Sequence, residues 1–254
     1  MPDPVRIALI YPSLLGTYGD GGNASVLAQR LRWRGIAAET IDVGLDDAVP
    51  EQADVYVLGG GEDVAQTLAV SKLAHGALGR AADGGRPVFA VCAGFQILGE
   101  TFLDGRGDVH AGLGLIDCRT DRLPGPRAVG ELLGEPVLDG LRGPLTGYEN
   151  HGGRTVLGPA AQPLATVKAG VGNGDAGVDG AVQGSVVATY LHGPALARNP
   201  ALADHLLTRA VGSALQPIDD AEEEELRRER LAFVRRAGRT RWWRRQWKPP
   251  AQDS

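Results

Sequence analysis

Cysteine is scarce in this sequence, and long apolar runs are absent. Cys92 and Cys118 are the only cysteines among 254 residues, too few for a disulfide framework, which favours a compartment that keeps thiols reduced. No apolar run is long enough to span a bilayer, and the N-terminus lacks the apolar core of a signal peptide. We therefore expect a cytoplasmic protein that buries one sizeable core.

A surplus of positive charge is also missing, as are the motifs of nucleotide and metal binding. The net charge of −5 gives no general case for binding nucleic acid. Neither the P-loop pattern nor G-x-G-x-x-G is present, and no set of histidine, cysteine and carboxylate side chains has metal-ligand spacing. The sequence therefore predicts no metal site and no cofactor in this chain.

Up to residue 103 the sequence alternates apolar strand-like segments with helix-like segments. The predicted strands are 5–11, 37–43, 54–58 and one ending at 92, and the predicted helices are 24–34, 62–82 and 95–102. Asn23 is a suitable N-cap for the first helix, and Gly35 is a suitable residue just past its end. The alternation predicts an α/β fold with a mainly parallel sheet flanked by helices, in which ligands collect at the carboxyl ends of the strands.

After residue 113 the pattern changes to short segments separated by glycine and proline. Short strands are predicted at 113–120, 155–157, 164–168 and 181–183, a stronger strand at 186–192, and a helix at 201–211. These short segments predict extra antiparallel strands added to the parallel sheet. Together with the first half they form a predicted domain over residues 1–215.

The remaining segment, 216–254, has a composition of its own. Residues 222–225 are acidic, basic residues dominate from 227 to 248, and the basic part contains Trp242, Trp243 and Trp247. Such a segment is a solvated charged helix, a surface that contacts an anionic membrane, or a brace for a partner protein. The sequence leaves these three alternatives open.

Cys92 stands at the most informative point of the chain. An apolar strand-like run ends at this cysteine, and Ala93, Gly94 and a predicted helix follow at once. A nucleophile on a tight strand-to-helix turn has this pattern, and the helix N-terminus favours a thiolate there. The alternative is an inert core cysteine, which is the reading we adopt for Cys118.

Two further features fit a nucleophile at Cys92. His192 ends a predicted strand before Gly193-Pro194 and would lie at the same sheet edge, where it is suited to act as a base. The glycines at 59–61 let the backbone approach a substrate closely, so an N–H from this loop and that of Ala93 are candidate oxyanion donors. Taken singly, the histidine fits a structural role at a strand end equally well, and the glycines fit a tight turn.

Together these segments resemble class I glutamine amidotransferases of the cobyric-acid-synthase-like branch. The resemblance rests on the triple glycine at 59–61, Cys-Ala-Gly-Phe-Gln at 92–96, Gly-Tyr-Glu-Asn-His-Gly-Gly at 147–153 and Tyr-Leu-His-Gly at 190–193. It covers about residues 5–212. Asp-Gly-Gly-Asn at 20–23, the overall length and the lack of a fused synthetase domain are most similar to the glutaminase subunits of lipid II isoglutaminyl synthases.

The resemblance implies a flavodoxin-like fold and a mechanism. Cys92 would attack the side-chain amide of L-glutamine, His192 would move the proton to ammonia, and a thioester would then be hydrolysed. Gly60 and Ala93 would supply the oxyanion hole, and Gln96 would help hold the amino-acid end of the substrate. The α-carboxylate also needs a cation, since an unpaired buried charge is costly, and Arg127 is our candidate, although it fits a solvated surface arginine equally well.

The sequence departs from the wider family at one position. Many class I members carry His-x-Glu, whereas here Gly193 and Pro194 follow His192, so the acid that orients the histidine is missing. Either a dyad suffices, or the acid comes from Asp20, from Glu149 or from a partner protein. His151 is left with two alternatives, a structural role or a place near the ammonia exit.

The resemblance also implies a partner. Because this chain has no ATP-binding motif, the ammonia would pass to a Mur-ligase-like synthetase subunit of the MurT type, which would hold ATP and magnesium. That subunit would amidate the D-glutamate α-carboxyl of lipid II to D-isoglutamine at the inner face of the membrane. Amidation of cobyrinic acid and a non-catalytic binding module of the same fold are the alternatives.

Overall fold

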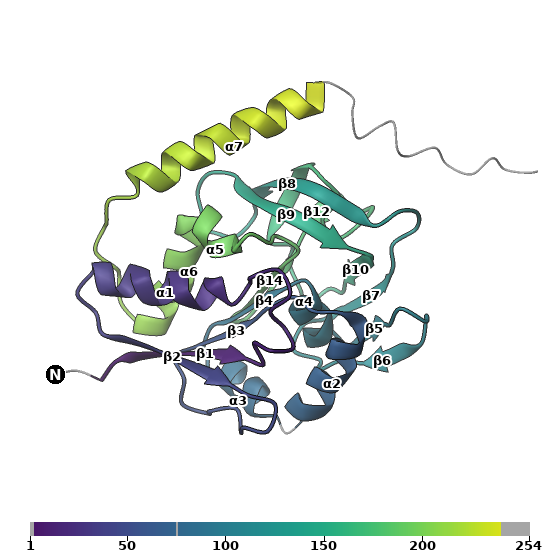
Figure 1. The fold of residues 1–254 in the computed structure, drawn as a ribbon, viewed down its shortest axis with the longest axis horizontal. Coiled ribbons are helices and arrows are strands. Elements are labelled where there is room, and N and C mark those ends of the chain that lie inside the picture. Colours follow the sequence, from purple (N-terminus) through teal and green to yellow (C-terminus); the bar gives the residue numbers. More distant parts are fainter. Residues whose placement is uncertain (1–2, 75, 240–254) are drawn as a thin grey trace, which may run out of the picture.

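A six-stranded sheet forms the centre of the protein, as seen in a computed structural model that describes residues 3–74 and 76–239 (Figure 1). The strand order is β13-β14-β4-β3-β1-β2, and every neighbouring pair is parallel except β13 with β14. Its strands are β1 (Val5–Ile10), β2 (Ala38–Val43), β3 (Val55–Leu58), β4 (Val88–Val91), β13 (Ala181–Gln183) and β14 (Val186–Thr189). The predicted α/β fold with a mainly parallel sheet is confirmed.

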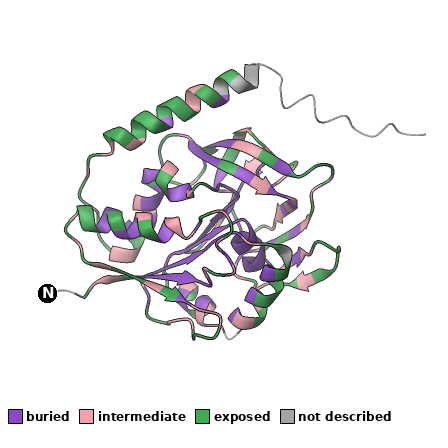
Figure 2. Ribbon diagram, viewed as in Figure 1, coloured by how far each residue is buried: buried purple, intermediate pink, exposed green. Residues whose placement is uncertain are grey.

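Helices cover both faces of this sheet. They are α1 (Gly22–Trp33), α2 (Asp63–Leu73), α3 (Ala77–Asp83), α4 (Ala93–Leu98), α5 (Ala195–Arg198) and α6 (Pro200–Val211). Figure 1 shows α1 and α6 on one side of the sheet and α2 and α3 on the other. Strands β3, β4 and β14 are buried along their whole length (Figure 2), as expected for parallel strands covered on both faces.

Several local predictions differ from the structure. The predicted helix 95–102 ends at Leu98, with Thr101–Leu103 in a strand, and the predicted strand 186–192 ends at Thr189. The predicted helix 62–82 is two helices, because Gly76 takes a left-handed conformation with φ of +78° between them. Residues 113–117 are not a strand, since Leu113 and Leu115 donate their N–H groups to the last carbonyls of α4 instead of to a neighbouring strand. Asn23 lies inside α1 rather than at its N-cap, and its side chain bonds the Asp20 carbonyl.

The added strands form two smaller antiparallel-rich sheets. One has the order β10-β7-β5-β6 and the other β12-β11-β8-β9. Their strands are β5 (Thr101–Leu103), β6 (Val109–Ala111), β7 (Cys118–Arg122), β8 (Ala128–Pro136), β9 (Leu145–His151), β10 (Gly153–Leu157), β11 (Ala165–Ala169) and β12 (Val178–Asp179). The antiparallel addition is as predicted, but β8 and β9 escaped sequence analysis because glycine and charged residues interrupt their apolar alternation.

The C-terminal helix α7 (Ala221–Arg239) packs against α5 and β9. Its own residues Arg227 and Val234 are buried, and the Arg227 guanidinium donates to the Pro144 carbonyl. Buried Arg30 on α1 bonds Asp204 and Asp220 at 2.7 and 2.6 Å, which ties the segment before α7 to the body. The three tryptophans of the basic segment lie outside the described residues, and no helix in the described ranges is long and apolar enough to cross a bilayer.

Candidate active site

Cys92 lies on the strained turn between β4 and α4. Its φ and ψ are 52° and −105°, a region that residues other than glycine rarely occupy. The Cys92 N–H is held by the Thr189 carbonyl of β14 at 2.9 Å, and its carbonyl accepts from Gln96 N–H. Gly94 is required here, because a Cβ at that position would lie 2.9 Å from the Leu58 Cβ. The turn therefore projects the thiol from the carboxyl edge of the sheet, as the sequence predicts.

His192 meets a buried carboxylate at the same edge. Its Nδ1 lies 2.9 Å from Oδ2 of Asp20, which is fully buried on the loop before α1. The His192 backbone pairs with Tyr148 of β9, and the Tyr18 ring packs edge-on against the imidazole with centroids 4.8 Å apart. The ring is thus held in one orientation, with Nε2 on the side away from Asp20.

The electrostatic setting of His192 favours its protonated form. Burial opposes a charged ring, but hydrogen bonding and charge attraction from Asp20 and Cys92 outweigh it and raise the pKa of His192 to about 9. An imidazolium between a carboxylate and a sulfur is the arrangement that stabilises a thiolate nucleophile.

Gly60 stands where these groups converge. A Cβ on Gly60 would lie 2.9 Å from His192 Cε1, 3.0 Å from Asp20 Oδ2 and 3.5 Å from Cys92 Cβ, so no other residue fits. The Gly60 N–H is donated to Asp20 Oδ2 at 2.9 Å. By contrast, the Ala93 N–H, in the first turn of α4, has no acceptor among the described residues.

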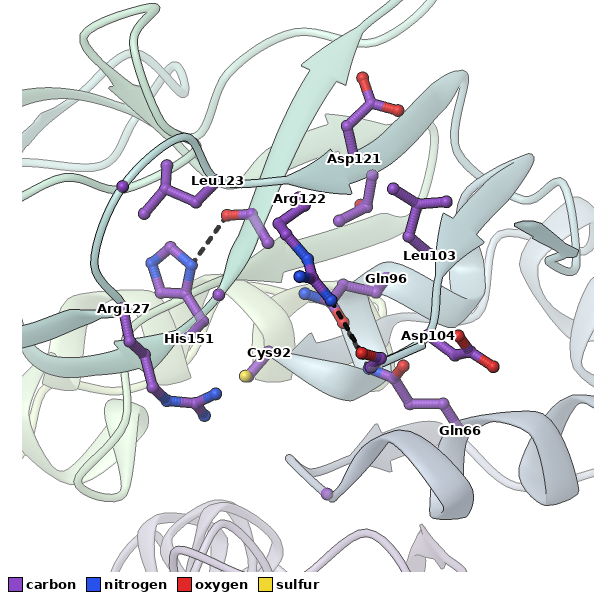
Figure 3. Close-up of a pocket in the computed structure, with 16 residues that line it drawn as sticks. Gln66, Cys92, Gln96, Leu103, Asp104, Asp121, Arg122, Leu123, Arg127 and His151 are labelled. Atoms are coloured by element: carbon purple, nitrogen blue, oxygen red, sulfur yellow. Dashed lines mark hydrogen bonds between the residues drawn. The ribbon is translucent and has the colours of Figure 1, made fainter. Parts of the chain in front are cut away.

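Cys92 opens into a cavity of about 250 Å³ (Figure 3). The cavity is lined by Gly61, Gln66, Cys92, Gln96, Leu103, Asp104, Gly105, Thr120, Asp121, Arg122, Leu123, Gly125, Arg127, His151, Gly152 and Gly153. The predicted residues Gln96 and Arg127 both line it with Cys92. Gly61 lines the cavity whereas Gly60 does not.

The two predicted substrate-binding side chains are held by different partners. Arg127, just before β8, donates through Nε to Asn150 Oδ1 at 2.6 Å and through a terminal nitrogen to the Asn150 carbonyl at 2.9 Å. Gln96 on α4 donates to the Tyr190 hydroxyl at 3.2 Å and accepts from Gln66 Nε2. Neither Gln66 nor Tyr190 was given a role from the sequence, although Tyr190 begins the Tyr-Leu-His-Gly motif and Gln66 lies shortly after the triple glycine.

A second buried histidine–carboxylate pair lies beside the cavity. His151 Nε2 is 3.5 Å from Glu149 Oε2, and the His151 ring stacks on Tyr190 with centroids 3.8 Å apart. Glu149 accepts backbone N–H groups from Val171 and Gly172 at 2.8 and 2.9 Å. Glu149 is therefore not beside His192, whereas Asp20 is.

Two other buried groups, neither of which lines the cavity, have strongly shifted pKa values. Burial raises the pKa of Asp179 to about 6, against hydrogen bonds from Thr189 and Tyr190 that lower it. Burial likewise raises the pKa of the Cys118 thiol to about 12, which makes it a poor nucleophile. No group of three or more histidine, cysteine and carboxylate residues that could hold a metal ion occurs within residues 3–74 and 76–239.

The fold with this turn at the carboxyl edge of its sheet is that of the class I glutamine amidotransferases. A crystal structure of a glutamine amidotransferase matches with a TM-score of 0.55 at 21% identity, covering 82% of this chain and 99% of that one, and it supports the fold alone. The chain belongs to the family with the CobB/CobQ-like glutamine amidotransferase domain, whose model matches residues 6–200. The resemblance drawn from the motifs is confirmed.

Two curated relatives match over most of their length. Subunit GatD of the lipid II isoglutaminyl synthase (glutamine-hydrolyzing) of Staphylococcus aureus is 31% identical over 229 residues, which are 87% of this chain and 91% of the relative. The subunit of the same name from Streptococcus pneumoniae is 32% identical over 83% of this chain and 82% of the relative.

Proposed function

We propose that this chain is the glutaminase subunit of a lipid II isoglutaminyl synthase. It hydrolyses L-glutamine to glutamate and ammonia and supplies the ammonia to a Mur-ligase-like subunit of the MurT type. The observation that supports the glutaminase activity is the convergence of Cys92, His192 and Asp20 around Gly60, with Cys92 lining the cavity. The similarity to GatD subunits over nearly their whole length supports lipid II as the acceptor of the ammonia.

In the proposed reaction Cys92 attacks the carboxamide carbon of glutamine. The His192 imidazolium gives its proton to the departing nitrogen, ammonia leaves, and a thioester to Cys92 remains. Water, deprotonated by the now neutral His192, attacks the thioester and releases glutamate with the thiolate restored. Each tetrahedral intermediate places negative charge on the carbonyl oxygen, which needs two preorganised N–H donors.

Ala93 N–H is one proposed donor because it has no acceptor of its own in the described residues. For the second donor the sequence pointed to Gly60, whose N–H is donated to Asp20 in the resting site. Gly61 lies in the same loop and lines the cavity, so its N–H is the alternative that needs no bond to break first. Arg127, with Gln96, remains our proposal for binding the amino-acid end of glutamine.

The acid that orients His192 is proposed to be Asp20. Of the two candidates in this chain, Asp20 has an oxygen within hydrogen-bonding distance of Nδ1, whereas Glu149 is engaged by Val171, Gly172 and His151. A carboxylate from the partner would then be unnecessary for His192, and the isolated chain should hydrolyse glutamine.

The acceptor half of the proposal places ATP and magnesium on the partner, which amidates the D-glutamate α-carboxyl of lipid II. This implies action in the cytoplasm, beside the membrane that carries the lipid. Amidation of cobyrinic acid is the runner-up. The predicted membrane contact of the basic segment falls on residues outside those described, so it stays a prediction that liposome binding of a chain shortened at 222 would test.

The test measures glutamate release from glutamine by the full chain and by Cys92→Ala, each alone and with a Mur-ligase-like partner, ATP and lipid II. We expect release that depends on Cys92 and amidated lipid II only when the partner is present. Cys118→Ala is the matched control, because Cys118 is buried away from the cavity. Absence of glutamate release under every condition would reject the glutaminase activity. Glutamate release without amidation of lipid II would reject only the proposed acceptor.

A further inference from the structure

We infer that Gln66 is a substrate-binding residue that determines specificity, by accepting a hydrogen bond from the α-ammonium group of glutamine. This inference rests on the proposed glutaminase function and deepens it. Gln66 is on α2, one turn past the glycine loop, and it is 2% exposed. Its Oε1 is buried without a hydrogen-bond partner among the residues that the structure describes, and the residue lines the cavity with Cys92 (Figure 3).

In the structure the oxygen end of the Gln66 amide is the free end. Tyr190 OH bonds Thr155 Oγ1 at 2.7 Å, and Gln96 Nε2 donates to the same hydroxyl at 3.2 Å. Gln96 Oε1 lies toward Gln66, which presents Nε2 to it. The Gln66 oxygen is left as an acceptor beside the cavity.

An unpaired buried acceptor is unfavourable, so we expect a bound ligand to donate a hydrogen bond to this oxygen. L-glutamine has two groups that carry N–H, the carboxamide and the α-ammonium. In the proposed reaction the carboxamide reacts at Cys92, and its nitrogen takes a proton from His192. The α-ammonium is therefore the donor that remains for Gln66.

The charged groups that line the cavity do not offer the ammonium a better acceptor. Asp104 accepts from the N–H groups of Arg106 and Asp108 and from His110 Nε2, all within 3.0 Å. Asp121 points away from Cys92 in Figure 3, and its nearest cationic partners are Arg119 and Arg154.

His151 Nε2 is the other buried cavity-lining atom without a hydrogen-bond partner in the described residues, and it lies 3.5 Å from Glu149. Its Nδ1 faces the Gly153 carbonyl, which can only accept, and Nε2 itself faces the Glu149 carboxylate. Gln66 Oε1 is the unpartnered side-chain oxygen that the described cavity-lining residues offer to an ammonium.

The test compares L-glutamine with 4-carbamoylbutanoate, which is glutamine without its α-amino group. Dissociation constants are measured by calorimetry on the full chain carrying Cys92→Ser, and kcat/KM is measured on the chain with Cys92 intact. Gln66→Leu should lower the preference for glutamine over 4-carbamoylbutanoate by about tenfold or more, because a hydrogen bond to a charged group is lost. Gln66→Glu keeps an acceptor and should keep the preference.

Gln29→Leu on the exposed face of α1 makes the same chemical change away from the cavity and should leave the preference unaltered. If Gln66→Leu weakens the binding of both ligands by the same factor, the preference is unchanged. That result would overturn the inference without contradicting the proposed glutaminase activity. Failure of the Cys92-intact parent chain to hydrolyse glutamine would instead reject the proposed function, and the inference with it.

Discussion

The protein contains two buried histidine–carboxylate pairs near one cavity, and they differ in what surrounds them. Asp20 and His192 are 2.9 Å apart, whereas Glu149 and His151 are 3.5 Å apart. His192 is next to Cys92, and its pKa is raised to about 9 by Asp20 and the cysteine against the effect of burial. His151 is stacked on Tyr190 and has its Nδ1 on the Gly153 carbonyl.

The two carboxylates also differ in their other donors. Asp20 receives one backbone N–H, from Gly60, in addition to His192. Glu149 receives two, from Val171 and Gly172, which satisfy both of its oxygens. A carboxylate already engaged by backbone donors has less negative potential to offer an imidazole. We therefore base the proposed catalytic role of His192 on its neighbouring cysteine and on the other donors of its carboxylate, and not on the histidine–carboxylate pairing alone.

The largest expected effect comes from exchanging the two histidines for asparagine. His192→Asn removes the proposed proton carrier and should lower kcat/KM for glutamine by roughly 10⁴-fold or more, as loss of a general acid and base does. His151→Asn should lower it by less than about tenfold, since Asn keeps a polar group beside Glu149. The measurement is the steady-state rate of glutamate release by both variants. Equal losses of kcat/KM would contradict the proposed difference between the two histidine–carboxylate pairs.

Asp20→Asn should have the next largest effect. The variant loses the carboxylate that raises the pKa of His192, so the pKa should fall from about 9 toward its ordinary range, and kcat/KM should fall by roughly 10²–10³-fold. The titration is followed by NMR of the His192 ring, with Asp47→Asn on a surface turn as the control. An unchanged His192 pKa would show that the carboxylate is not its charge partner.

Glu149→Gln should affect stability more than activity. An amide keeps one acceptor oxygen and turns its NH₂ toward the Val171 or Gly172 N–H, leaving a buried donor unpaired at a cost of about 1–3 kcal/mol in the free energy of unfolding. Urea unfolding measures this loss, with Glu135→Gln on the exposed side of β8 as the matched control. A loss of activity as large as that of Asp20→Asn, without loss of stability, would contradict a structural role.

The smallest effect is a pH dependence of stability confined to the Asp20–His192 pair. The pKa of His192 is about 9 in the folded protein and 6.5 for the free side chain, so its contribution is complete below about 6.5 and is lost as pH rises through 9. The difference in unfolding free energy between the parent chain and Asp20→Asn should therefore shrink over this range. A difference that is constant from pH 6 to pH 10 would show that His192 is not preferentially protonated in the fold.

The first half of the fold could be predicted because its strands and helices follow their own local patterns. The runs at β3 and β4 are continuous, apolar and buried, as is the part of β1 after Arg6, and Gly35 ends α1 with a φ of +70° as expected. The helix break at Gly76 was not predicted because it depends on a left-handed backbone conformation. The irregular structure of residues 113–117 was not predicted because it depends on bonds to the carbonyls at the end of α4. Strands β8 and β9 are stabilised by pairing with each other, which no local pattern reveals.

The sequence by itself determined the family and the principal chemical groups, because the tight turn at Cys92 and the glycines that surround it require particular residue types at fixed spacing. Only the tertiary structure decided which acid stands beside His192 and which polar atom in the cavity lacks a partner. Asp20 and His192 are 172 residues apart, and Gln66 and Gln96 are 30 apart. Such contacts are created by the packing of separate elements, so their partners cannot be assigned from the sequence around either residue.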